Sequence, residues 1–324
     1  MGWRGRRWSV KGRDAKSPPP SCLGQGLTEY IRVATFGFIR QFDGDSAEPS
    51  KAERMAATAV NNFNHTFFKE KEEAMISTWS VVSSPVHMAV ILPLYLLFIY
   101  KTAPQFMSTR KPYELKKTIM VYNLLQILGN AYMVVVYVNM MRNKPFSFWS
   151  NVCYPVSAVQ NFDPLAKIEL LNGMYLYYTN KIVDLLDTVF FALRKKDSQI
   201  TFLHVFHHIT MIASTWLSVF YIREEISAVF AVTNAVIHVV MYSYYFLSSL
   251  GPAVQKHLWW KKYITKMQIA QFILFLTLLA KMKVDRCDCS TLFWTLWIFN
   301  TTSFLVLFLH FYWRNYNKQL KKNS

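Results

Sequence analysis

Three histidines lie within five residues of one apolar stretch, the segment TFLHVFHHIT from Thr201 to Thr210. On a helix the positions i, i+3 and i+4 share a face, so His204, His207 and His208 project together. An imidazole can act as a nucleophile, a proton carrier or a metal ligand. The cluster therefore indicates a covalent, acid–base or metal site inside a hydrophobic segment.

Polar side chains interrupt three further apolar segments at helical spacing. They are Lys181, Asp184, Asp187 and Thr188 in KIVDLLDTVFF; Asn234, His238, Tyr242 and Tyr245 in NAVIHVVMYSYY; and Thr265, Gln268 and Gln271 in TKMQIAQF. Ionisable residues within a membrane are costly and usually face the interior of a helix bundle or a water-filled cavity. We therefore expect the four stripes to face one another.

The segments that carry these polar stripes are predicted to be membrane spans. Of the 324 residues, 52% are hydrophobic and 16% are aromatic, in long apolar blocks that a soluble chain of this length rarely carries. The fold class is therefore an all-α integral membrane protein. Runs of about 20 apolar residues predict seven transmembrane helices over residues 82–100, 119–138, 170–192, 200–221, 226–247, 263–280 and 293–311.

Basic residues gather in alternate loops and in the carboxyl-terminal tail, where they account for most of the formal net charge of +17. The positive-inside rule places the amino terminus in the lumen and the carboxyl terminus in the cytosol. Basic loops on one side of a bilayer argue against a nucleic-acid partner, because no uniformly basic surface is predicted.

The polar stripes share one depth in this orientation. At a rise of about 1.5 Å per residue, His207, His238, Asp187 and the two glutamines lie about 8 to 13 Å from the cytosolic ends of their spans. A site at this level, opening toward basic loops, suits a substrate with a polyanionic head in the cytosol. An apolar tail of that substrate would run toward the lumen.

The chain divides into four parts. The first is a basic extension rich in Pro, Gly and Ser, which we expect to be disordered and which has no signal peptide. Because its charge conflicts with a luminal amino terminus, Met55 is a candidate for the working start. The parts are residues 1–60 (extension), 61–81 (luminal segment), 82–312 (membrane domain) and 313–324 (cytosolic tail).

Two short signals agree with this topology. Asn64 begins a glycosylation sequon in the luminal segment. Lys321 and Lys322 form a KKxx ending on the cytosolic tail, which resembles a signal for retrieval to the endoplasmic reticulum. We therefore expect a multi-pass protein of the endoplasmic reticulum membrane.

Cysteines are absent from every predicted span. Cys153 follows the second span, while Cys287 and Cys289 follow the sixth, so all three lie in predicted luminal loops. An oxidising compartment would allow Cys153 to pair with either of the other two.

From about Phe63 to the end, the sequence resembles the very-long-chain fatty acid elongases, the 3-oxoacyl-CoA synthases of the endoplasmic reticulum. The resemblance rests on KIVDLLDT, HVFHH, HVVMYSYY and TKMQIAQF in the family's order, followed by the dilysine ending. Asp184 departs from the pattern, since most members carry Glu at that position. The resemblance implies a seven-helix bundle that encloses an acyl tunnel and condenses acyl-CoA with malonyl-CoA, releasing carbon dioxide. Its histidine and glutamine motifs look more like those of members that handle long and very long chains, which supply sphingolipid precursors.

The resemblance also implies roles for the stripe residues. His207 is expected to accept the acyl group as an acyl-imidazole, with His238 as acid, base or oxyanion partner and His204 and His208 orienting it. Lys181, Asp184 and Asp187 are expected to form a buried ion network, with Asp187 as the partner of a histidine N–H. Hydrogen bonds to the substrate are assigned to Thr188, Asn234, Tyr242, Tyr245, Gln268 and Gln271.

Coenzyme A phosphates would meet basic residues at the cytosolic face, namely Lys195, Lys196, Lys261 and Lys262. Positive-inside anchoring explains the same lysines equally well. We expect no tightly bound cofactor and no metal. The expected partners are acyl-CoA, malonyl-CoA, membrane lipids, other enzymes of the elongation cycle and further copies of the chain.

Three other functions share parts of this pattern. The spacing HxxHH also occurs in membrane di-iron desaturases and hydroxylases, but two irons need many N and O ligands, and at most four of the eight histidines lie near the site. A seven-helix transporter fits the topology alone. A receptor fits it less well, because the polar stripes meet near the cytosolic side.

Overall fold

The computed structural model describes residues 51, 70–142, 152–153 and 164–317, and among these residues the secondary structure is helical with no strand. The predicted extension with Met55 and Asn64, and the tail with Lys321 and Lys322, lie outside the described residues. From Pro85 onward the helices are α3 (Pro85–Leu97), η1 (Phe98–Thr102), α4 (Ala103–Met107), α5 (Lys116–Arg142), α6 (Pro164–Val183), α7 (Leu186–Leu193), η2 (Asp197–Gln199), α8 (Phe202–Leu217), η3 (Ser218–Ile222), α9 (Ile226–Ser249), α10 (Pro252–Gln255), α11 (Lys261–Val284), α12 (Thr291–Tyr312) and η4 (Trp313–Asn317).

Six helical stretches are long and apolar enough to cross a membrane, judged by length and composition. This marks a multi-pass membrane protein. The stretches are Pro85–Met107, Lys116–Met140, Phe202–Ile222, Ile226–Ser249, Lys261–Val284 and Thr291–Tyr316. They correspond to six of the seven predicted spans, while residues 170–192 form α6 and α7 with a turn between them.

Two local sequence signals explain where α3 begins and where it changes into η1. Ser84 caps α3, because its side chain accepts a hydrogen bond from the amide of Val86 at 3.2 Å. Pro104 has no N–H to donate to the carbonyl four residues earlier. The ladder therefore widens into the π-helical turn η1, where the amide of Ala103 donates to the carbonyl of Phe98.

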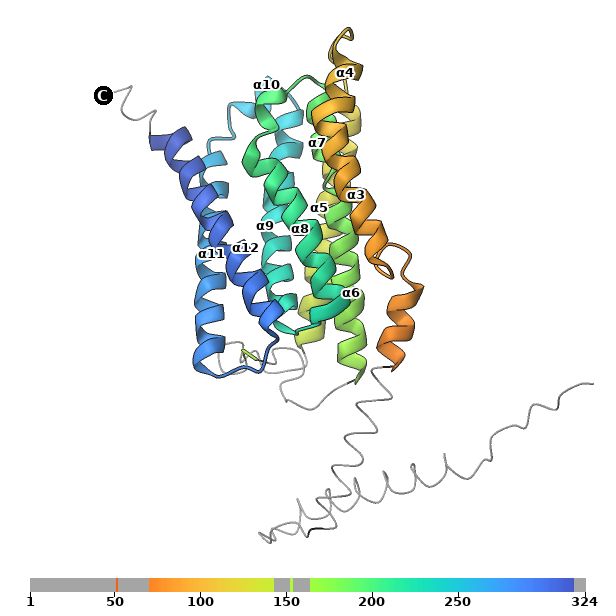
Figure 1. The fold of residues 1–324 in the computed structure, drawn as a ribbon. Coiled ribbons are helices and arrows are strands. Elements are labelled where there is room, and N and C mark those ends of the chain that lie inside the picture. Colours follow the sequence, from red (N-terminus) through yellow and green to blue (C-terminus); the bar gives the residue numbers. More distant parts are fainter. Residues whose placement is uncertain (1–50, 52–69, 143–151, 154–163, 318–324) are drawn as a thin grey trace, which may run out of the picture. The chain divides into compact units, whose positions relative to one another are not determined.

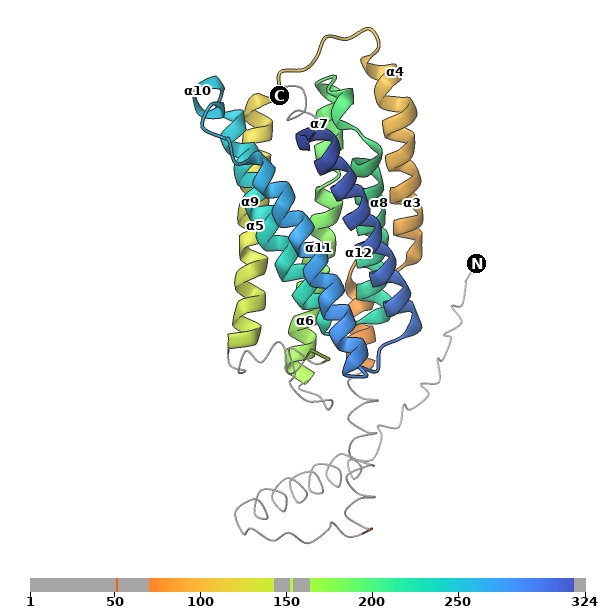
Figure 2. The ribbon, with the colours of Figure 1, turned by 90° about the vertical axis from the view of Figure 1, so that its left-hand side faces the viewer.

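The long helices pack side by side as a bundle (Figures 1 and 2). The α5–α9 pair makes the most extensive helix contact, and α11 packs on both α12 and α9. Two large apolar clusters fill the bundle: one draws on α5, α6, α8 and α9, and the other on α9, α11 and α12. The helix α9 belongs to both clusters, and its polar residues Asn234, His238 and Tyr242 are buried.

One disulfide ties two loops together at one end of the bundle. Cys153, after α5, is bonded to Cys287, after α11, with their Cα atoms 5.3 Å apart. This is one of the two pairings that the sequence left open. Cys289 keeps a free thiol, and burial, followed by the negative charges of Glu224 and Asp288, raises its pKa to about 12.

Candidate active site

The turn between α6 and α7 sets the directions of the polar residues in KIVDLLDT. The amides of Leu185, Asp187 and Thr188 each donate to the carbonyl three residues earlier, at 3.1 Å. This local tightening breaks the 3.6-residue period that a continuous helix would keep. The polar residues of the segment therefore do not share one continuous helix: Lys181 lies in α6, Asp184 in the turn, and Asp187 and Thr188 in α7.

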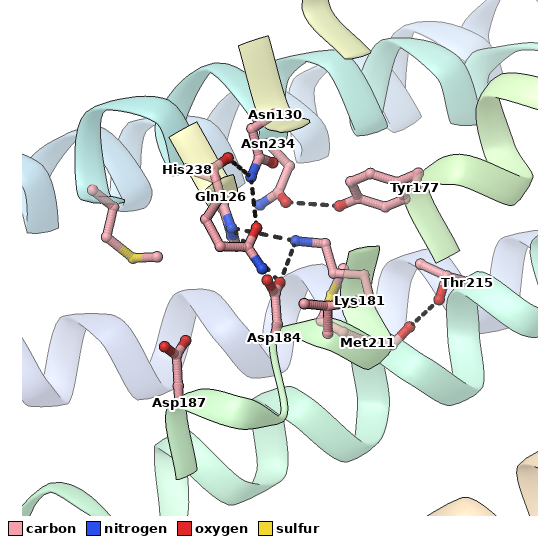
Figure 3. A network of polar contacts seen from close by, with 12 residues as sticks. Gln126, Asn130, Tyr177, Lys181, Asp184, Asp187, Met211, Thr215, Asn234 and His238 are labelled. Atoms are coloured by element: carbon pink, nitrogen blue, oxygen red, sulfur yellow. Dashed lines mark hydrogen bonds and ion pairs between the residues drawn. The ribbon is translucent and has the colours of Figure 1, made fainter. Parts of the chain in front are cut away.

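A buried ion pair lies at that turn and reaches α9 (Figure 3). Lys181 Nζ is 2.9 Å from Asp184 Oδ2 and 3.3 Å from His238 Nδ1. Lys181 and Asp184 are each only 1% exposed, so neither charge is balanced by bulk water. The ion network expected from the sequence thus forms with Asp184 at its centre.

This contact fixes the tautomer of His238. An ammonium group has hydrogen-bond donors and no acceptor, so Nδ1 of His238 must accept from Lys181. The imidazole of His238 is then neutral and carries its hydrogen on Nε2. Asp184 Oδ2, 3.8 Å from the same Nδ1, interacts with His238 through charge and not through a hydrogen bond.

Among the described residues Asp187 has no histidine partner, which corrects the expectation from the sequence. Its Oδ2 lies 2.8 Å from the hydroxyl of Tyr242, and Asp184 Oδ1 lies 3.1 Å from the same hydroxyl. The carboxylate beside a histidine is Asp184. The physical reason is the turn before α7, which rotates Asp187 away from the direction that helical spacing assigned to it.

The HVFHH segment begins α8, where the Thr201 side chain caps the helix by accepting from the amide of His204 at 3.3 Å. His204 Nε2 lies 2.8 Å from the hydroxyl of Thr188, which in turn lies 2.8 Å from the hydroxyl of Tyr95. Thr188 thus orients His204 and is already engaged on both sides. Tyr95, on α3, was not among the predicted site residues.

His207 and His208 lie beside this chain and are held by ring contacts. The ring centroid of His208 lies 4.4 Å from that of His204 and 5.4 Å from that of His207. The ring of His207 also packs at 5.2 Å from Phe304 of α12. Within the described part of the chain, neither ring nitrogen of His207 makes a hydrogen bond, so this imidazole has a free lone pair.

A fifth polar stripe, on α5, escaped the interpretation of the sequence. Asn130 Nδ2 donates to Gln126 Oε1 at 3.2 Å, Gln126 Nε2 donates to the hydroxyl of Tyr122 at 3.4 Å, and that hydroxyl is 3.4 Å from the hydroxyl of Tyr242. All three α5 residues are buried. The i, i+4, i+8 spacing in YNLLQILGN was the available signal.

The remaining predicted substrate contacts are less closely connected to this network. Asn234 accepts from the hydroxyl of Tyr177 at 2.7 Å. Tyr245 is 40% exposed, with its ring edge-on to Tyr242 at 6.0 Å. Gln268 Nε2 lies 4.0 Å from the sulfur of Met241.

Gln271 and Thr265 are buried on α11. The side chain of Gln271 makes no hydrogen bond to any described residue. An amide that has no hydrogen bond within the described part of the protein is available to a bound molecule.

The four predicted lysines are exposed and lie at helix ends. Lys195 and Lys196 follow α7, and Lys195 adopts the left-handed conformation with φ of 52°. Lys261 and Lys262 begin α11, with Lys262 Nζ 5.2 Å from the ring of Tyr263.

The described residues contain no group of three or more His, Cys, Asp and Glu side chains arranged to hold a metal ion. The arrangement offers a neutral imidazole with a free lone pair, an Nε2–H donor on α9 and a buried ion pair that orients this donor.

Comparison with known proteins agrees with the motifs. A family model described as the ELO: GNS1/SUR4 family matches residues 80–324. The chain is 37% identical to very long chain fatty acid elongase 7 of Rattus norvegicus over 246 residues, covering 75% of this chain and 85% of that protein. It is 32% identical to very long chain fatty acid elongase 4 of Homo sapiens over 283 residues, covering 86% and 87%. It is 37% identical to very long chain fatty acid elongase F of Drosophila melanogaster over 256 residues, covering 75% and 94%. The chain therefore belongs to the ELO family.

Proposed function

We propose that this protein is a condensing enzyme of fatty acid elongation, a very-long-chain 3-oxoacyl-CoA synthase. It joins acyl-CoA to malonyl-CoA and yields 3-oxoacyl-CoA, coenzyme A and carbon dioxide. The family and the printed names of its relatives support this class of activity.

The observation that carries the proposal is the different hydrogen-bonding state of two imidazoles, His207 on α8 and His238 on α9. His207 has no hydrogen-bond partner among the described residues, whereas His238 is held as the Nε2–H tautomer by Lys181. None of the cysteines in the described residues lies in a helix, so a histidine is the natural nucleophile. The first imidazole has a lone pair for attack, and the second has a hydrogen for a developing oxyanion.

Two steps complete the reaction. In the first, His207 attacks the thioester carbonyl, the C–S bond breaks, and the coenzyme A thiolate leaves with the proton given up by the imidazole. In the second, malonyl-CoA loses carbon dioxide and the electron pair left behind forms an enolate. The enolate carbon attacks the acyl-imidazole, the C–N bond breaks, and the imidazole regains a proton from the medium. His238 Nε2–H stabilises the carbonyl oxygen in both tetrahedral intermediates.

The proposed topology has seven spans, the third formed by α6 and α7 together. A turn within this span is tolerable because it is buried in protein, where Tyr242 and Lys181 satisfy the side chains around it. The disulfide supports a luminal location for the loops after α5 and α11. The amino terminus then lies in the lumen and the carboxyl terminus in the cytosol of an endoplasmic reticulum protein.

The exposed lysines after α7 and at the start of α11 lie at the opposite end of the bundle from the disulfide, since α11 runs from Lys261 to Val284 and is followed by Cys287. Phosphates of coenzyme A would meet this basic end. The acyl chain would then extend from His207 toward the disulfide end.

The test is incorporation of radiolabelled malonyl-CoA by purified protein, with a panel of acyl-CoA chain lengths and unsaturations. The expected products are two carbons longer than each accepted acyl-CoA. An intact, correctly folded preparation that lengthens none of them would overturn the proposal.

A further inference from the structure

Two carboxyl oxygens, one each from Asp184 and Asp187, contact the hydroxyl of Tyr242. This hydroxyl lies 2.8 Å from Asp187 Oδ2 and 3.1 Å from Asp184 Oδ1, and Tyr242 is fully buried. Oxygen atoms approach to these distances when a hydrogen lies between them. A separate two-centre hydrogen bond in each of the two contacts requires two hydrogens.

Tyr242 supplies only one of them. A phenol has one hydrogen to donate, and an ionised carboxylate has none. If both aspartates were ionised, one contact would press two acceptors together in an interior of low dielectric constant. Such a contact costs free energy because the repulsion is not screened by water.

The positive charges near Tyr242 balance the charge of Asp184 but not that of Asp187. Lys181 forms its ion pair with Asp184 at 2.9 Å. His238 accepts from Lys181 and is therefore neutral, by the donor argument above. Among the described residues, no lysine or arginine forms an ion pair with Asp187.

The other groups that face Asp187 are phenols. On α5, Tyr122 has its hydroxyl 3.4 Å from that of Tyr242 and 3.5 Å from the carbonyl of Val183, and it accepts from Gln126. On α3, Tyr95 has its hydroxyl on Thr188. On α9, Tyr245 contacts Tyr242 through its ring. Tyr122 also makes a side-chain hydrogen bond to Asp187, but none of these contacts places a hydrogen between Asp187 and Tyr242.

We propose that Asp187 is a neutral carboxylic acid that donates its own hydrogen to Tyr242. Tyr242 then donates to Asp184 Oδ1, while Lys181 donates to Asp184 Oδ2 and to His238 Nδ1. Every contact in this chain has one hydrogen, and a single negative charge faces a single positive charge.

The inference rests on the proposed function, in which His238 Nε2–H serves the oxyanion, and it makes Asp187 a positioning residue. The acid does not touch the substrate. Because Asp187 donates to Tyr242, the hydrogen of Tyr242 is donated to Asp184. That hydrogen bond holds the carboxylate of Asp184 in place, and this carboxylate in turn keeps Lys181 next to His238. Asp184 and Asp187 thus differ in charge, although both are aspartates of one motif.

The first test compares Asp187→Asn with Asp187→Ala, and Asp184→Asn is the matched control. An asparagine at 187 keeps the shape and places an N–H where the acid had its O–H. We expect Asp187→Asn to keep kcat within about threefold of the unmodified protein. Asp187→Ala and Asp184→Asn are expected to lower kcat by about 10- to 150-fold, the range for losing a hydrogen bond to a charged network. Equal losses in Asp187→Asn and Asp187→Ala would overturn the inference.

The second test does not need activity. Infrared spectra of protein labelled with carbon-13 in the aspartate carboxyl group are recorded in lipid nanodiscs, in water and in deuterium oxide. We expect one carboxylic acid band that shifts on deuteration, disappears in Asp187→Asn and persists in Asp184→Asn. The absence of such a band in the unmodified protein, or its loss only in Asp184→Asn, would overturn the inference. If no acyl-CoA is lengthened, the proposed function fails, while the band still decides the protonation state of Asp187.

Discussion

Lys181→Met removes the cation that pairs with Asp184 and leaves this carboxylate without a counter-charge among the described residues. Lys181 and Asp184 are each 1% exposed, so water cannot replace the ammonium. Removing one partner of a buried pair costs about 3 to 5 kcal/mol of stability. A buried aspartate avoids its unpaired charge by taking up a proton.

The free energy of binding that proton determines how the stability of Lys181→Met depends on pH. An aspartate with an ordinary pKa of about 3.9 needs about 4 kcal/mol to bind a proton at pH 7 and about 1.5 kcal/mol at pH 5. The folded variant holds this proton and the unfolded variant releases it above about pH 4. The stability of Lys181→Met therefore falls, relative to the unmodified protein, by about 1.4 kcal/mol for each pH unit between pH 5 and 7.

The assay is thermal unfolding in detergent at pH 5, 6 and 7, with Lys181→Met/Asp184→Asn as the matched control. The double variant carries neither charge, so we expect its stability to exceed that of Lys181→Met at pH 7 and to show no such slope. Neither variant is expected to condense substrates, because Nδ1 of His238 loses its donor. A deficit in Lys181→Met that is the same at all three pH values would refute the reasoning.

Three further predictions concern separate parts of the molecule. His207→Ala is expected to abolish condensation while leaving a folded protein, as judged by malonyl-CoA incorporation and size-exclusion chromatography; retained turnover would exclude it as the acyl acceptor. Tyr137→Phe is expected to raise stability by about 1 to 3 kcal/mol, because the hydroxyl of Tyr137 is enclosed and has no hydrogen-bond partner among the described residues; a lower melting temperature would contradict this. In a Cys22→Ser background, the rate of maleimide labelling of Cys289, followed by mass spectrometry, is expected to rise about tenfold per pH unit until the pH reaches the thiol pKa of about 12. A labelling rate that stops rising near pH 9 would contradict this.

Much of this arrangement follows from the sequence because it rests on local periodicity. Apolar runs marked six stretches that are long and apolar enough to cross a membrane. The i, i+3, i+4 spacing gathered the three histidines of α8 on one side, and their ring contacts agree.

The rest depends on where helices break and how they pair. Asp184 lies two residues before α7, and a single turn there reassigns Asp187 from a histidine to Tyr242. Helical periodicity does not predict a break between two helices, and KIVDLLDT contains neither Gly nor Pro to signal one. The Gln126 stripe was missed because amides in an apolar run resemble ordinary helix packing until a partner helix is known.

The distance along the chain between Lys181 and His238 has a consequence for biosynthesis. The two residues are 57 positions apart, and ribosomes add about 5 to 20 residues per second. For roughly 3 to 11 seconds, therefore, the newly made α6 has no α9 to receive its ammonium group. In that interval the charged turn has only its own ion pair, and lipid offers it no further donor. We expect the segment to wait in an aqueous or protein-lined environment during translation, and to enter the bilayer interior only when α9 arrives.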